Sequence, residues 1–186
     1  MDRADGPKWQ EIYDIAESQS GYVARDQVMA AGYSSPLLEY HVRVGHLIRV
    51  QRGVYRLAQF PTGEHEDLVV TWLWSRRLGV FSHETALMLH LLSDALPAQA
   101  HLILPMGWAK RRVRVPTGVS VSFGDIRKQE WGWVGAIPVT TPLRTVVDCV
   151  AAHVEPLLIQ QAKREGLSRG LFSREQLTLA LKHHAK

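Results

Sequence analysis

The stretch GYSSPLLEYHVRVGHLIRVQRGVYRL, residues 32–57, decides the fold of the first part of the chain. Ser35 can cap a helix with its hydroxyl, and Pro36 then takes the first helical position, where a missing N–H costs nothing. Leu38, His41 and Val42 repeat at helical spacing, so we expect that side of the helix to be buried. Gly45 stands where a residue with left-handed backbone ends a helix.

Two short β-prone runs follow this helix. Residues 47–50 and 54–57 are separated by Gln51-Arg52-Gly53, and such a glycine-containing turn predicts a hairpin. Upstream, apolar spacing predicts a first helix over residues 9–18 and a short second helix over residues 24–30. Three helices and a hairpin with arginines in this order are typical of a winged helix-turn-helix.

The Pro/Gly stretch at residues 59–63 predicts a domain boundary. We therefore expect a DNA-binding domain over residues 1–60 and a second domain over residues 61–186. The second domain shows mixed helical and extended patterns, so the predicted fold class is α+β, although its topology does not follow from the pattern. The expected helices cover 66–78, 83–92, 141–152, 156–166 and 174–183, and the expected extended segments cover 101–104, 119–123 and 133–139.

Composition limits the classes of function. The net charge is +4, and Cys149 is the only cysteine, so one chain can form neither a disulfide nor a cysteine-based metal site. The start of the chain does not read as a signal peptide, and its apolar runs are too short to span a bilayer, so we expect a cytoplasmic protein without a membrane partner. Within residues 1–60 most acids come early, whereas four later arginines are accompanied only by Glu39. This segregation is what a DNA-facing surface requires.

The candidate DNA contacts lie on the helix and hairpin of the quoted stretch. Small polar residues at a helix start let backbone N–H groups approach a phosphate, and long side chains reach phosphates or base edges. A solvated helix face and an unpartnered turn arginine are the alternative. The candidate DNA-binding residues are Tyr33, Ser34, Ser35, Tyr40, Arg43, Arg49, Gln51 and Arg52.

No catalytic site or metal site is predicted. His83 and His90 lie seven residues apart, but a hydrolytic zinc helix needs a histidine four residues after the first, where Leu87 stands. Ser82 lacks the glycines of a nucleophile elbow, so we expect Ser82 and His83 to cap and pack a helix. Arg144 and Asp148 have the spacing of a local ion pair. No cofactor is expected.

A second basic cluster lies beside a tryptophan far beyond the first domain. It can extend the DNA footprint, contact an acidic protein surface, or form a solvated loop. The tryptophans at 131 and 133 are further interface candidates, of which we expect at least one in the core. The candidate partner-binding residues are Trp108, Lys110, Arg111, Arg112 and Arg114.

Four blocks of sequence carry a resemblance to a known family. They are Ala31-Gly32 with Gly45-His46-Leu47 and Arg52-Gly53-Val54-Tyr55; Ser82 to Leu87 with Leu92-Ser93-Asp94 and Pro97; His101-Leu102 leading into Leu104-Pro105; and Thr140 to Asp148. In this order, from about Val23 to Asp148, they make the chain similar to the AbiEi family of antitoxins, the DNA-binding halves of bacterial type IV toxin–antitoxin systems.

The resemblance implies an N-terminal winged helix-turn-helix that binds inverted-repeat operator DNA and represses its own operon, with two copies on one repeat as an open alternative. It also implies a C-terminal antitoxin domain and a nucleotidyltransferase-like toxin as partner, neutralised by a direct complex, by modification or indirectly. Two other functions stay open: a DNA-targeted, metal-dependent nuclease, and a ligand-sensing regulator without a toxin.

Overall fold

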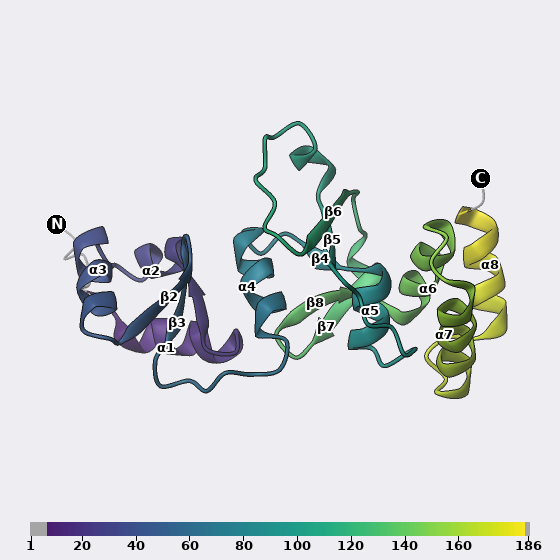
Figure 1. Ribbon diagram of the computed structural model, residues 1–186, viewed down its shortest axis with the longest axis horizontal. Coiled ribbons are helices and arrows are strands. Elements are labelled where there is room, and N and C mark those ends of the chain that lie inside the picture. Colours follow the sequence, from purple (N-terminus) through teal and green to yellow (C-terminus); the bar gives the residue numbers. More distant parts are fainter. Residues whose placement is uncertain (1–6, 185–186) are drawn as a thin grey trace. The chain divides into compact units, whose positions relative to one another are not determined.

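The computed structural model describes residues 7–184. It divides the chain into two compact units between Arg77 and Leu78, here called the first and second units. Both units combine helices with a sheet, and Figure 1 labels their elements along the chain. The α+β fold class is thereby confirmed.

The first unit is a winged helix-turn-helix, as expected. Its strands form an antiparallel sheet in the order β1-β3-β2, in which β2 and β3 are the predicted hairpin. Tyr22 and Val23 belong to the third strand of this sheet, because both residues pair with β3. The elements are α1 (Trp9–Ser18), β1 (Tyr22–Ala24), α2 (Arg25–Ala30), α3 (Ser35–Arg43), β2 (Leu47–Gln51), β3 (Val54–Leu57) and α4 (Glu66–Trp74).

The start of α3 differs from the expectation by one residue. Ser34, not Ser35, is the capping residue, and its hydroxyl accepts a 3.4 Å hydrogen bond from the Leu37 backbone N–H. Pro36 therefore occupies the second helical position, where its missing N–H is equally harmless. The helix stop is as predicted, since Gly45 has a left-handed backbone with φ of 82°.

A continuous apolar core holds α3 against the rest of the unit. Leu38, the buried residue of α3, packs with Ile12 and Ala16 of α1, Val28 of α2 and Leu57 of β3. This packing fixes the axis of α3 and leaves its outer side exposed.

Helix α4 belongs to the first unit, so the compact division lies beyond the boundary expected after residue 60. The Tyr22 hydroxyl donates a 2.6 Å hydrogen bond to Glu66, and Arg77 forms an ion pair of 2.7 Å with Asp26 of α2. The Pro/Gly stretch is a loop inside the unit, because contacts from distant β1 and α2 hold the segment that follows it.

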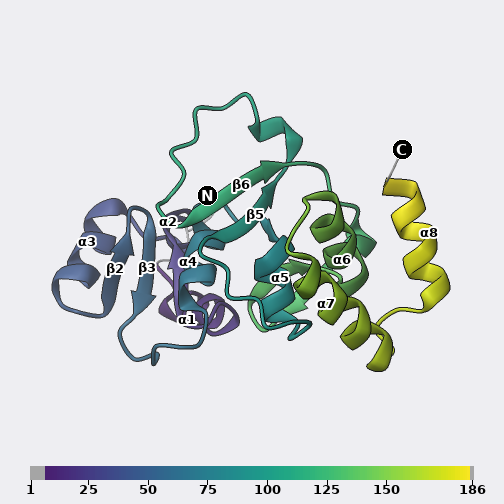
Figure 2. The same cartoon turned by 45° about the vertical axis from the view of Figure 1, so that its right-hand side comes forward.

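The second unit is built on a five-stranded mixed sheet in the order β6-β5-β4-β8-β7. The pairs β5–β6 and β4–β8 are parallel, whereas β4–β5 and β7–β8 are antiparallel. Figure 2 shows α6, α7 and α8 together at one end of this unit. The elements are β4 (Val80–Phe81), α5 (His83–Leu89), β5 (Ala100–Leu104), β6 (Val119–Phe123), β7 (Trp131–Val134), β8 (Ile137–Thr140), α6 (Pro142–Ala151), α7 (Pro156–Ser168) and α8 (Arg174–His184).

Two features of this sheet differ from the sequence expectation. Strand β4 was not predicted, because two residues are too short for a detectable pattern. The segment expected to be extended over residues 133–139 is a hairpin that turns at Gly135, whose φ is 57°. In the described part of the chain, no helix combines the length and the apolarity needed to cross a membrane.

Candidate nucleic-acid interface

A groove of about 1010 Å³ lies in the first unit between α3, the β2–β3 hairpin, α2 and the end of α4. Its walls carry Arg25, Arg43, Arg49, Arg52 and Arg76, and all five side chains are exposed. Two acids, Asp26 and Glu39, also line it. The groove is therefore strongly cationic and combines the helix and the hairpin with which winged helices contact DNA.

The fold positions these arginines in different ways. Arg43 lies over the ring of Tyr40 at 5.8 Å, which holds both side chains on the outer side of α3. Arg25 donates a 2.6 Å hydrogen bond to the Ser35 hydroxyl and so connects the start of α2 to the start of α3. Arg49 stands at an irregularity of the β2–β3 pairing, because the register of the two strands shifts between Arg49 and Gln51.

Of the predicted DNA-binding residues, Arg43, Arg49 and Arg52 line the groove, whereas Tyr33 and Gln51 do not fit a DNA-facing surface. Tyr33 is only 5% exposed and packs in the core beside Trp9 and His41, so its ring cannot reach DNA. The side-chain amide nitrogen of Gln51 is buried rather than directed outward. Ser34 is occupied as a helix cap and Ser35 as the acceptor for Arg25.

Sequence reasoning missed Arg25 and Arg76. They lie on α2 and just after α4, elements that the linear pattern did not assign to the DNA face. The sequence offers no signal that identifies them, because Arg25 stands beside the acid Asp26 and Arg76 is one of two adjacent arginines outside the helix and hairpin.

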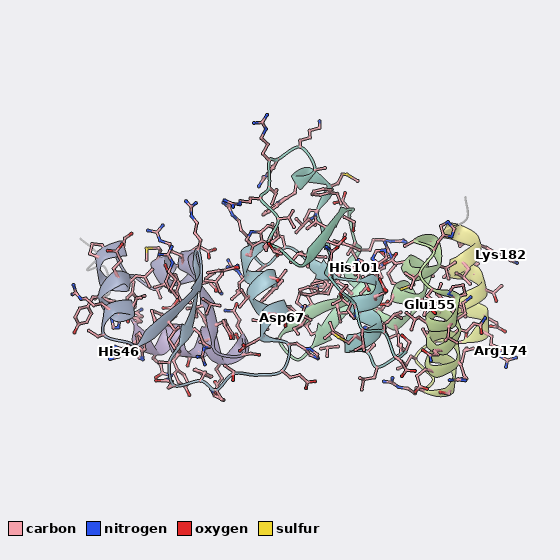
Figure 3. All side chains as sticks on the ribbon, in the orientation of Figure 1. His46, Asp67, His101, Glu155, Arg174 and Lys182 are labelled. Atoms are coloured by element: carbon pink, nitrogen blue, oxygen red, sulfur yellow. The ribbon has the colours of Figure 1, made fainter. Side chains whose placement is uncertain are left out.

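A pair of histidines holds the junction between α3 and the hairpin. Nδ1 of His41 lies 3.0 Å from Nδ1 of His46, and the Trp9 ring stacks on His41 at 4.9 Å. Burial, and secondarily the neighbouring His46, lowers the pKa of His41. His41 is thus a packed histidine, as expected, and Figure 3 shows His46 at the end of α3 that leads into β2.

The second basic cluster lies on a long arm between β5 and β6, residues 105–118, which projects at the top of Figure 1. Lys110, Arg112 and Arg114 are exposed on it. Trp108 is not available as an exposed anchor, because it is only 9% exposed and Arg111 covers its ring at 5.1 Å. Trp133 of β7, by contrast, is 54% exposed, while its neighbour Trp131 is half-buried.

Helix α5 starts with a polar cluster rather than the predicted cap. The buried Ser82 hydroxyl lies 2.8 Å from Nδ1 of His83 and makes no capping bond. Burial is the main cause that lowers the pKa of His83. Nε2 of His101 lies 3.2 Å from a carboxylate oxygen of Glu84, and these two side chains and His83 border a cavity of about 390 Å³.

The predicted pair of Arg144 and Asp148 is confirmed at 2.7 Å, and Arg144 also reaches Glu130 at 3.3 Å. Desolvation opposes the charge of Arg144, but the two carboxylates outweigh it and raise the pKa of the guanidinium. Among residues 7–184, no group of three or more His, Cys, Asp or Glu side chains is placed to hold a metal ion.

Comparison with known proteins agrees with this geometry. The chain matches no curated protein. It is similar in structure to the RV2827C protein from Mycobacterium tuberculosis, with a TM-score of 0.58 and 14% identity over 97% of this chain and 73% of the other. At that identity the likeness supports the fold alone. Residues 10–58 match the family model described as "Transcriptional regulator, AbiEi antitoxin". The region that carries α3, the hairpin and most arginines of the groove is therefore the part of this chain that is similar to the AbiEi antitoxin family of transcriptional regulators.

Proposed function

We propose that the first unit binds an inverted repeat in double-stranded DNA upstream of its own operon and represses transcription from it. The observation that carries this proposal is the groove between α3 and the hairpin, with Arg43, Arg49 and Arg52 on its walls. Arginines supply most of the phosphate contacts that position a protein on a duplex, and each neutralised phosphate releases counterions. Arg25 and Arg76 line the same groove and add to its positive charge.

The specificity of such a domain comes partly from pairing two half-sites. α3 is only nine residues long, so direct reading of bases by one copy covers few base pairs. Two copies bound to an inverted repeat together contact twice as many base pairs, although each copy keeps the same interface with the DNA.

The test is a titration of the full-length chain against its upstream inverted repeat. Arg43→Ala and Arg52→Ala should each weaken binding several-fold at physiological salt, while the unfolding midpoint stays unchanged because both side chains are exposed. Arg174→Ala is the matched control, since Arg174 is an exposed arginine of α8 outside the groove. Unchanged affinity in both groove variants would remove the proposed DNA face. Cleavage of the duplex on addition of Mg²⁺ would favour a nuclease instead.

We further propose that the second unit opposes a nucleotidyltransferase-like toxin, through a surface that includes the arm at residues 105–118. The arm carries four cations, and no acid occurs between residues 95 and 124, so it favours an acidic partner surface. Arg111 lies on the Trp108 ring at the base of the arm, and Lys110, Arg112 and Arg114 are exposed beside it.

This part of the proposal is tested by growth rescue in cells that express the toxin. Replacing Lys110, Arg112 and Arg114 together by Ser should reduce rescue but leave operator binding intact. The matched control replaces Arg164 and Arg174, exposed cations of α7 and α8, in the same way. Equal rescue by both variants would show that the arm does not contact the toxin.

A further inference from the structure

Glu39 lies in the middle of α3, exposed on the outer side of the helix and within the lining of the arginine groove. A carboxylate at this position is unexpected on a surface that faces phosphates, because like charges repel it from the DNA backbone. Glu39 should weaken non-specific binding to DNA, so its presence at the centre of α3 needs a physical explanation.

The simplest reason, an ion pair with a groove arginine, is not what the structure has. Arg43 stands four residues after Glu39, the favoured order and spacing for a helical ion pair, yet Arg43 lies over the Tyr40 ring instead. Within residues 7–184 the Glu39 carboxylate makes neither an ion pair nor a side-chain hydrogen bond. The other acid of the groove, Asp26, is held by Arg77. Glu39 is thus the acid of this surface that keeps its acceptor oxygens available.

Only one kind of group on duplex DNA attracts a carboxylate. Phosphates repel it, and in the major groove the hydrogen-bond donors are the exocyclic amino groups of cytosine and adenine. Glutamate accepts from cytosine N4, whereas adenine is recognised best by the combined donor and acceptor of Asn or Gln. The second helix of a helix-turn-helix lies in the major groove, where its side chains meet base edges, and α3 is that helix here.

We propose that Glu39 determines specificity by accepting a hydrogen bond from the N4 amino group of a cytosine in each half-site. This inference rests on the proposed DNA-binding function. In that arrangement Arg43, Arg49 and Arg52 hold the backbone, and Glu39 rejects base pairs that present an acceptor at the same place. The carboxylate lowers affinity for every other sequence and so increases discrimination.

The experiment selects bound duplexes from a library with randomised half-sites, using the full chain. Wild type should prefer cytosine about 10-fold at one position of each half-site, within the range of a single base-reading contact. Glu39→Gln should move that preference to adenine, because an amide pairs with adenine N6 and N7. Glu39→Ala should lose the preference at that position while binding other sequences at least as tightly as wild type.

Glu17→Gln is the control, since it removes the same charge from an exposed site on α1 outside the groove. It should select the same sequences as wild type. Identical base preferences in all four proteins would overturn the role of Glu39 and leave the proposed function standing. If wild type selects no sequence at all, the proposed function fails and the inference fails with it.

Discussion

Arg77 donates two hydrogen bonds, of 3.1 and 2.7 Å, to the two carboxylate oxygens of Asp26, a residue 51 positions earlier in the chain. The pair connects the residues after α4 to the start of α2, so it holds the last segment of the first unit against an earlier helix. The hydrogen bonds from Arg77 are the main cause that holds the pKa of Asp26 below its ordinary value of 3.8.

This relationship predicts a pH dependence. Because the pKa of Asp26 is lower in the folded state, the pair stabilises the unit at neutral pH, and the stabilisation is lost as pH falls through the folded-state pKa. Asp26→Asn should lower the free energy of unfolding by at most about 1 kcal/mol at pH 7, since the pair is partly exposed. Urea titrations should find that this difference starts to shrink near the ordinary pKa of 3.8 and is close to zero only once the pH is below the lowered folded-state pKa. A difference that is equal at both pH values would contradict the assignment.

The buried Tyr22 hydroxyl should stabilise the same unit from β1. Burial, and then the 2.6 Å bond to Glu66, raises the pKa of Tyr22 to about 12. Tyr22→Phe removes a hydrogen bond to a charged acceptor, so we expect a loss of about 1–3 kcal/mol in unfolding free energy at pH 7. Tyr40→Phe, at an exposed ring, is the control. The Tyr22 contribution should fade as pH rises from 10 towards 12, because the unfolded phenol ionises first.

Gly166 of α7 should resist a substitution that normally strengthens helices. Ala in place of Gly raises helix stability by about 1 kcal/mol at an open site. Here an added Cβ would run into the Phe172 ring, so Gly166→Ala should lower the thermal midpoint of the chain. Combining it with Phe172→Leu, which trims the ring, should recover part of the loss. A raised midpoint in the single variant would show that Phe172 does not pack against Gly166.

Fragments test where the first unit ends. A fragment of residues 1–77 keeps α4 with its contacts to β1 and α2, whereas residues 1–60 lack Glu66 and Arg77. We expect the longer fragment to unfold cooperatively at a higher temperature and to bind operator DNA, and neither fragment to rescue growth against the toxin. Rescue by either fragment would place the antitoxin activity in the first unit. Equal midpoints for the two fragments would show that α4 is dispensable.

The sequence predicted the first unit well where structure is encoded locally. The Gly45 stop, the turn at Gly53 and the apolar spacing of α1 and α3 are each decided within a few residues, and all appear as expected. Strand β1 was missed because it has three residues and is defined by its pairing with β3, thirty or more positions later. The capping residue is Ser34 and not Ser35. The sequence could not distinguish them, because adjacent serines cap a helix equally well.

The candidate site was predictable only in part, because a local sequence pattern does not record contacts between distant segments. Arg43, Arg49 and Arg52 come from one continuous stretch, so their meeting in one groove follows from a helix and hairpin. Arg25 and Arg76 reach that groove through tertiary packing, which no local pattern records. Tyr33 was misjudged because a turn residue next to a helix start is usually exposed, whereas here its ring completes the core.

The salt dependence of operator binding is the sharpest test of the proposal that the arginine groove binds DNA. Fluorescence anisotropy with the full chain should give a logarithm of affinity that falls linearly with the logarithm of salt, by about 0.9 for each phosphate neutralised. Arg43→Ala and Arg52→Ala should each reduce that slope by about 1, and Arg174→Ala should leave it unchanged. The account is contradicted if the slope of wild type is near zero, or if neither groove variant changes it.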